Sequence, residues 1–125
     1  MRVKSLLAVF MSAMLMTSAF TASADNRAKS YRRALELFDN GMYERASTIF
    51  ESLSDDPLSE GYSVLCALKM RTDDYPARIA AYDRKYPASS LTARLHYEYA
   101  LRLFDQDRYP DAARELARVP EHTVA

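Results

Sequence analysis

The chain has 125 residues, and its 17 basic and 17 acidic side chains give a net charge of zero. Both signs are interspersed along the sequence, so the composition favours neither a nucleic-acid-binding protein, which carries a basic face, nor a protein attracted to an anionic membrane surface. Cys66 is the only cysteine, which excludes an internal disulfide.

Residues 1–24 have the organisation of a secretory signal peptide. Arg2 and Lys4 form a short basic region before an apolar stretch. Ala22-Ser23-Ala24 then fits the small-residue rule for signal peptidase, which predicts cleavage after Ala24 and export. The alternative is an uncleaved membrane anchor, but the apolar stretch 5–20 has 16 residues, short of the ~20 that a spanning helix needs.

The remaining 101 residues are enough for one domain. Arg2 and Lys4 leave with the signal peptide, so this part carries two more acidic than basic side chains. β-branched residues form no alternating runs, and apolar residues recur instead at the spacing of one helix face. We therefore expect an all-α domain over residues 25–120, followed by a frayed tail at 121–125.

The first predicted unit is a pair of helices, at about 27–40 and 43–54. Asn40 and Gly41 separate them, and Gly41 can adopt the positive φ that often follows the end of a helix. Each helix carries an apolar stripe at helical spacing. The stripes are Tyr31, Ala34, Leu35 and Phe38 in the first helix, and Tyr43, Ala46, Ile49, Phe50 and Leu53 in the second.

The second unit has the same form. Asp56 can cap its first helix, with Pro57 in the first turn, where the missing N–H would have no partner. Its second helix is expected to begin at Tyr75, after a polar break. Ser89 or Ser90 is expected to cap the helix that follows.

The third unit repeats the pattern, with a polar turn at 105–107 and Pro120 after the last helix. Its apolar stripes are Leu91, Leu95, Tyr99, Leu103 and Phe104, and then Tyr109, Ala112, Ala113, Leu116 and Val119. Six helices in three hairpins therefore account for nearly all of the predicted domain.

The chain also contains an internal repeat. Residues 34–46 return 66 positions later as residues 100–112, and seven of these thirteen positions are identical. A weaker copy lies midway, from Ala67 to Arg78, with one residue missing from its turn. A period of about 33–34 residues is typical of stacked helical hairpins, and such arrays usually bind other proteins.

These units resemble the tetratricopeptide repeat family over about residues 27–119. The matching residues, which are expected to pack the repeats, are Ala34, Tyr43, Ala46 and Phe50, then Ala67, Tyr75 and Tyr82, and then Ala100, Tyr109, Ala112 and Leu116. The middle unit departs from the family pattern at Arg78, where a small residue would let the two helices approach. The resemblance implies three stacked hairpins in a short right-handed solenoid.

The resemblance also implies a binding surface, because ligands of this family lie in a concave groove lined by the first helix of each hairpin. The implied groove is mostly apolar and aromatic and suits an extended or helical segment of a partner. Its residues are Tyr31, Leu35 and Asp39 in the first unit, Val64, Leu68 and Arg71 in the second, and Tyr97, Leu101 and Asp105 in the third. The alternative for the three leucines is that they pack inside the hairpins.

Few residues outside this pattern point to chemistry. Glu98 lies two positions after His96, but side chains at this spacing on a helix point apart, so a solvated histidine is expected. Cys66 lies among apolar residues and is expected to be a buried, unreactive thiol. The sequence contains no metal-ligand spacing, phosphate loop or nucleophile motif, so we expect neither an enzyme nor a cofactor.

The turn at 86–89, together with the signal peptide, is most similar to tetratricopeptide proteins of the bacterial periplasm that serve envelope assembly. The chain is therefore predicted to be a non-catalytic scaffold of the periplasm or cell envelope that binds a protein or peptide partner. Neither nucleic acid nor a membrane surface is expected as a partner of the mature form. The alternatives are a membrane-tethered accessory subunit, the N-terminal part of a longer array and, less expected, a small-ligand carrier or an enzyme.

The end of the array has a further consequence. Terminal repeats normally carry a polar capping helix, whereas this sequence ends soon after its sixth predicted helix. Tyr109, Leu116 and Val119 are therefore expected to leave an apolar edge that is covered by a second copy, by a partner or by further repeats.

Cleavage behind Ala24 would make Asp25 the first residue of the exported protein. N-terminal sequencing of the protein recovered from the envelope fraction is expected to start at Asp25-Asn26-Arg27. A sequence that starts at Met1 would instead support the uncleaved anchor.

Overall fold

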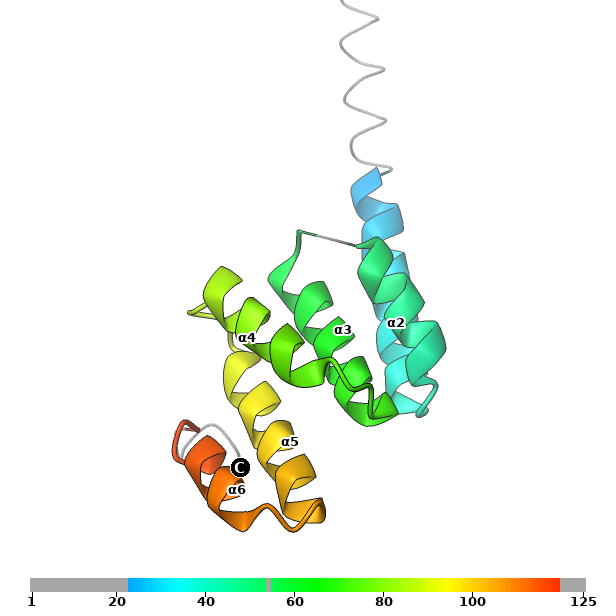
Figure 1. Cartoon of the computed structure of the whole chain (residues 1–125). Helices are drawn as coiled ribbons and strands as arrows, with labels where there is room; N and C mark the ends of the chain where they lie inside the picture. Colours follow the sequence, from blue (N-terminus) through cyan, green and yellow to red (C-terminus); the bar gives the residue numbers. More distant parts are fainter. Residues whose placement is uncertain (1–22, 54, 120–125) are drawn as a thin grey trace, which may run out of the picture.

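The computed structural model describes residues 23–53 and 55–119. Every regular element within them is an α-helix, and the helices pack as three consecutive hairpins, which confirms the predicted all-α helical solenoid (Figure 1). Residues 23–39 are helical and form the first hairpin together with α2. The labelled helices are α2 (Tyr43–Ser52), α3 (Pro57–Met70), α4 (Tyr75–Lys85), α5 (Thr92–Asp105) and α6 (Tyr109–Leu116).

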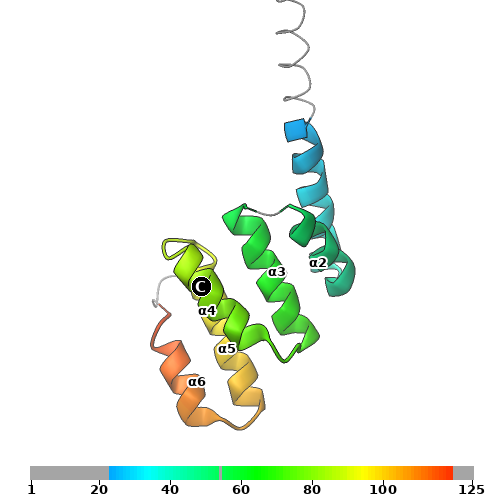
Figure 2. The ribbon, with the colours of Figure 1, turned by 45° about the horizontal axis from the view of Figure 1, so that its top comes forward.

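The first helix and α2 lie at one end of the array and α6 lies at the other (Figure 2). The predicted signal peptide, 1–24, lies outside the described residues except for its last two, and the predicted tail at 121–125 lies wholly outside them. The first hairpin is slightly displaced from its predicted bounds: it is helical from residue 23 onwards, and α2 ends at Ser52.

The first and third hairpins turn in the same way. Gly41 has φ 76° and Asp107, which lies 66 positions later, has φ 61°. The next residue in each turn donates its N–H back into the preceding helix, Met42 to the Leu37 carbonyl at 2.8 Å and Arg108 to the Leu103 carbonyl at 2.9 Å. The internal repeat therefore extends to the backbone, and the positive φ expected at Gly41 is confirmed.

The cap predicted for α3 is present, whereas the cap predicted for α5 is not. Asp56 accepts hydrogen bonds from the backbone N–H of Ser59 at 3.1 Å and from its hydroxyl at 2.8 Å. Leu91 precedes α5 and makes no side-chain cap. The hydroxyl of Ser89 instead accepts the N–H of Leu91 at 3.1 Å and lies 2.6 Å from the hydroxyl of Tyr82, so it stabilises the turn rather than the helix end.

Helix α3 is the most enclosed element of the described fold, because α2, α4 and α5 all pack on it. Six consecutive residues, 63–68, are buried, so α3 has no exposed face along this part. Gly61 permits the close approach at its start, since an added Cβ would lie 2.5 Å from Leu91 and 2.8 Å from the hydroxyl of Tyr82. A side chain at position 61 would require Leu91 and Tyr82 to shift.

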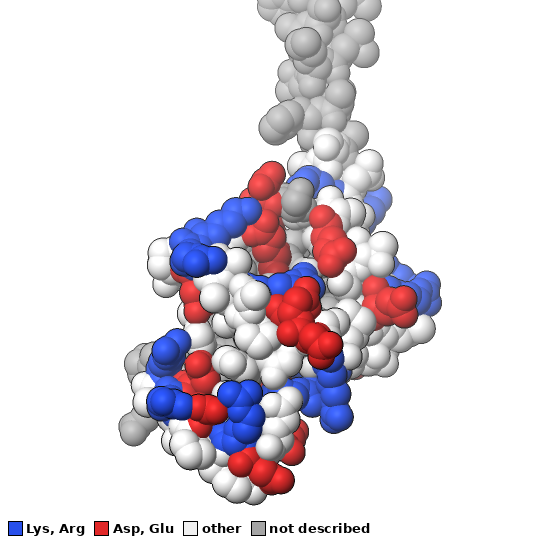
Figure 3. All heavy atoms as spheres, viewed as in Figure 1, with Lys and Arg blue, Asp and Glu red and all other residues white. Residues whose placement is uncertain are grey.

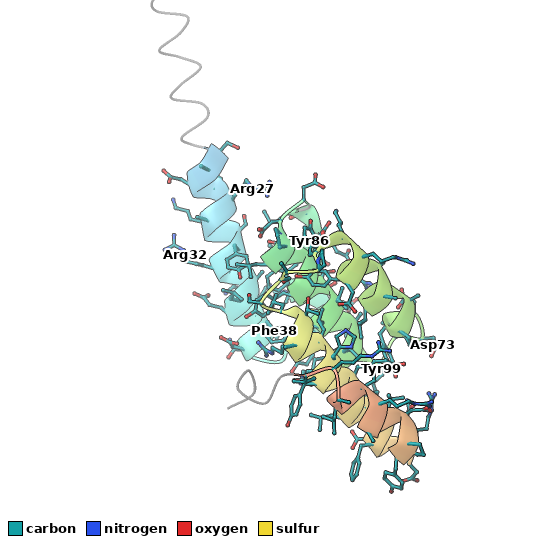
Figure 4. The ribbon with its side chains drawn as sticks, turned by 90° about the vertical axis from the view of Figure 1, so that its left-hand side faces the viewer. Arg27, Arg32, Phe38, Asp73, Tyr86 and Tyr99 are labelled. Atoms are coloured by element: carbon teal, nitrogen blue, oxygen red, sulfur yellow. The ribbon has the colours of Figure 1, made fainter. Side chains whose placement is uncertain are left out.

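Aromatic rings fill the space between the first hairpin and α3. Phe50 of α2 is fully buried and stacks on Tyr62 of α3, with ring centroids 5.2 Å apart. Phe38 meets the same tyrosine edge-on at 5.3 Å. Figure 4 places Phe38 where the first helix meets the start of α5, and the guanidinium of Arg94 lies 5.7 Å from its ring centroid. Such edge-on and offset pairs stabilise a core beyond the area that they bury.

The residues expected to pack the repeats are mostly inside. Eight of them are buried, namely Ala34, Ala46, Phe50, Ala67, Tyr75, Tyr82, Ala100 and Ala112. Tyr43 is half-buried. Tyr109 and Leu116 are 52% and 46% exposed, so they pack no following repeat: no further hairpin covers the last one within the part of the chain that the structure describes. Their exposure agrees with the apolar edge expected from the sequence.

Replacing Phe50 by Ala removes the central ring of the aromatic layer and leaves a cavity. We expect Phe50→Ala to lower the free energy of unfolding by ~3–5 kcal/mol. Urea unfolding followed by circular dichroism measures this loss. The control is Phe104→Ala, which makes the same chemical change at a ring that is 58% exposed and should cost much less in dilute solution. Equal losses for the two variants would contradict the packing described here.

Candidate functional site

A cleft of about 330 Å³ lies between α2, α3 and α4. Its floor is apolar and consists of Val64 and Tyr82, with the fully buried Phe50 beside them. The other residues that line it are polar, charged or small, namely Glu51, Glu60, Ser63, Arg78, Ala81 and Lys85. An apolar floor with polar groups around it is the usual form of a binding site in proteins.

The cleft exists because the middle hairpin departs from the repeat. Ala46 and Ala112 are buried in the first and third hairpins at the position that Arg78 holds in the second. Arg78 donates a hydrogen bond to Ser63 of α3 at 2.9 Å and lies 3.7 Å from Glu51 of α2. A guanidinium thus occupies the space that an alanine would leave for close packing, and α3 and α4 pack less closely than α5 and α6 do.

The rim of the cleft carries paired charges. Lys85 donates a hydrogen bond to Glu60 at 2.7 Å, and this bond is the main reason why the pKa of Lys85 is raised. Burial on its own raises the pKa of Glu60, but the hydrogen bond and the attraction of Lys85 outweigh it, so the pKa of this carboxyl is lowered. Both groups are therefore held in their ionised forms. Figure 3 shows acidic and basic side chains interspersed over this face, without a broad area of one sign.

The residues expected in a concave groove are distributed differently. Val64 alone among them lines this cleft, and Tyr31 lines a separate hollow of about 340 Å³ beside Leu53 and Leu58. Leu68 is 2% exposed and lies in the core, so its assignment to a partner-binding surface is corrected: α5 covers it, and Arg102 of α5 donates a hydrogen bond to its carbonyl. The remaining ones are half-buried (Leu35, Tyr97) or exposed (Asp39, Arg71, Leu101, Asp105).

His96 is buried, which overturns the expectation of a solvated side chain. Its Nε2 lies 2.6 Å from an oxygen of Asp83 in α4, and its Nδ1 lies 2.7 Å from an oxygen of Glu115 in α6. His96 itself is 6% exposed. Glu98, two positions after His96, instead pairs with Lys69 at 3.2 Å. The histidine therefore joins three helices.

The geometry of His96 is that of a structural link. Nδ1 and Nε2 each lie within hydrogen-bond distance of a carboxylate oxygen, so both ring nitrogens are occupied by these contacts. Neither nitrogen is then available to take a proton from a substrate or to bind a metal ion. Among residues 23–53 and 55–119, no group of three or more His, Cys, Asp or Glu side chains is arranged to hold a metal.

Cys66 is fully buried in α3. Burial raises the pKa of its thiol to about 11, because a thiolate would lose its hydration in the core. Since the thiolate is the nucleophile, Cys66 is unreactive in the folded chain, as its apolar neighbours indicated.

The contacts of Arg78 and of His96 are not predicted by the sequence. Arg78 was visible as a departure from the repeat, but its partners Ser63 and Glu51 lie 15 and 27 positions away. Asp83 and Glu115 likewise lie on other helices than His96. The sequence would predict these contacts only if it also showed how the three hairpins align against one another.

In the described part of the chain, no helix has the length and hydropathy needed to cross a bilayer. No protein-family model matches the chain, and no curated protein and no solved structure is significantly similar to it.

Removing the imidazole of His96 would leave the oxygens of Asp83 and Glu115 without the ring nitrogens that they contact at 2.6 and 2.7 Å. We expect His96→Leu to destabilise the fold by about 3 kcal/mol, because two hydrogen bonds to carboxylates are lost between three helices. Chemical unfolding at neutral pH measures the effect. Adding Asp83→Asn and Glu115→Gln to His96→Leu should restore part of the loss.

The control for this prediction is Arg33→Ala, which breaks the exposed Arg33–Glu36 pair and should cost less than about 1 kcal/mol. If His96→Leu were no more destabilising than Arg33→Ala, the histidine would not be the link between the three helices.

Proposed function

We propose that the chain is an exported, non-catalytic scaffold that binds a segment of a partner protein in the cleft between α2, α3 and α4. The observation that carries this proposal is the open cleft itself, with an apolar floor and charges of both signs on its rim. The array of helical hairpins, its resemblance to tetratricopeptide repeats and the signal-peptide pattern support the same function.

The lining of the cleft favours a peptide over a small molecule. Its charged groups lie on the rim and bind one another rather than converging on one point, as Arg78 does with Glu51 and Lys85 with Glu60. A peptide can place an apolar side chain on Val64 and Tyr82 and exchange hydrogen bonds with these rim groups. Burying one such side chain contributes about 1.5–3 kcal/mol, so a useful affinity requires several contacts along the segment.

Site-specific photo-crosslinking in the cells that make the protein tests this function. A benzophenone side chain is placed at Ala81, which lines the cleft, or at the neighbouring exposed Ala80, which does not. We expect a discrete adduct with a partner protein from position 81 and none from position 80, since neighbouring helical positions face different directions.

A second pair of variants separates binding from proximity. Ala81→Trp fills the cleft and should abolish co-purification of the crosslinked partner, whereas Ala80→Trp should leave it unchanged. Adducts of equal yield from both positions, or a partner that still binds Ala81→Trp, would place the binding surface elsewhere.

A further inference from the structure

An apolar face is exposed at the free end of the last hairpin. Phe104 and Tyr109 are 58% and 52% exposed, and they form an edge-on ring pair with centroids 5.1 Å apart. Leu101 and Leu116 on the same two helices are 41% and 46% exposed. Contiguous apolar groups on a soluble domain usually mark a surface that another protein covers.

The equivalent face of the first hairpin, 66 positions earlier, shows how such a pair of rings is covered in this fold. Phe38 and Tyr43, 66 positions earlier, form the same edge-on pair at 5.3 Å. There the pair faces the next hairpin, and Phe38 is only 6% exposed because Tyr62 meets its ring at 5.3 Å. The second hairpin is also covered by a ring, but from a different position of the next helix, since its Tyr75 meets Tyr99 of α5 at 5.4 Å. Only the last of the three described faces lacks such a ring.

The charges around this end face are balanced, so they do not oppose contact with a second copy of the same face. Residues 101–119 contain four arginines and four acidic residues, in alternating clusters. Several already pair within α6 and its turn, as Arg108 does with Asp111 at 2.8 Å. A face with no excess of either sign does not select an oppositely charged partner, but it is compatible with a second copy of itself.

Stacking of the first hairpin of one copy on the last hairpin of another would continue the array, but the sequence does not suit it. The covering ring of the first interface is Tyr62, five positions before Ala67. In the second interface the covering ring is Tyr99, one position before Ala100, and the positions equivalent to Tyr62 and Tyr99 before Ala34 are Lys29 and Arg33. The first helix therefore presents basic side chains where a ring is required against Phe104 and Tyr109. The last hairpin itself carries the exposed rings that such a contact needs.

We propose that this end face binds the same face of a second copy of the chain, so that two molecules form a twofold-symmetric dimer. Phe104 and Tyr109 of each copy lie at its centre, and the arginines and carboxylates of α6 and its turn surround them. The dimer leaves the cleft between α2, α3 and α4 free, because the two surfaces lie on different hairpins.

Analytical ultracentrifugation of the full chain over a range of concentrations tests the dimer. We expect the mass to rise from one to two chains and to stop there. Phe104→Asp should raise the dissociation constant of the dimer about 30-fold or more, the effect of a central interface residue. Met42→Asp places the same charge on another exposed apolar residue, at 43% exposure, and should leave the dimer intact.

Tyr109→Ser provides a second variant that weakens the same contact without adding charge, and thermal unfolding of each variant in dilute solution verifies that it is folded. Three results would overturn the proposal. They are a chain that stays monomeric at all concentrations, a dimer that Phe104→Asp and Tyr109→Ser do not weaken, and open-ended growth that indicates head-to-tail stacking. None of them bears on the crosslink expected from Ala81.

Discussion

The burial of α3 on all sides holds the three hairpins together. A single hairpin cannot hide its own apolar face, so an array gains its stability at the contacts between neighbours. Helix α3 takes part in both contacts of this chain, with the aromatic layer of the first hairpin on one side and α5 on the other. The stack of Phe50 on Tyr62 and the close approach at Gly61 are therefore requirements for the whole domain rather than local details.

The functional surfaces proposed here arise where the repeat is broken. The repeated alanines, Ala46 and Ala112, let helices approach closely, and Arg78 at the same position keeps α3 and α4 apart and opens a cleft. The end face has the opposite origin, because it keeps the repeated pair Phe104 and Tyr109 but has no covering ring among the residues that the structure describes. The repeated packing thus stabilises the array. The proposed surfaces lie at the second hairpin, which departs from the repeat, and at the last described hairpin, which is uncovered.

The sequence predicts those features that depend on neighbours along the chain. The helical hairpins, the cap at Asp56 and the turn at Gly41 follow from local periodicity and backbone preference, and the structure contains all three. The burial of His96 and the hydrogen bond from Arg78 to Ser63 do not follow, because each joins helices whose relative register is set only by packing. For the same reason the sequence does not predict the cleft between α2, α3 and α4, which differs from the groove on the first helices that the family resemblance implies.

If the chain is exported, as we propose, the buried thiol of Cys66 makes the chemistry of the exported protein depend on its folding. In an oxidising compartment a free cysteine is open to disulfide exchange with any other thiol or disulfide, but only as a solvent-accessible thiolate. Full burial and a pKa of about 11 withhold Cys66 from this reaction while α3 stays packed. Once the chain unfolds, the thiol returns to ordinary reactivity and can be trapped in a covalent bond to another molecule, which prevents refolding. Unfolding that would be reversible in a reducing solution thus becomes a one-way step after export.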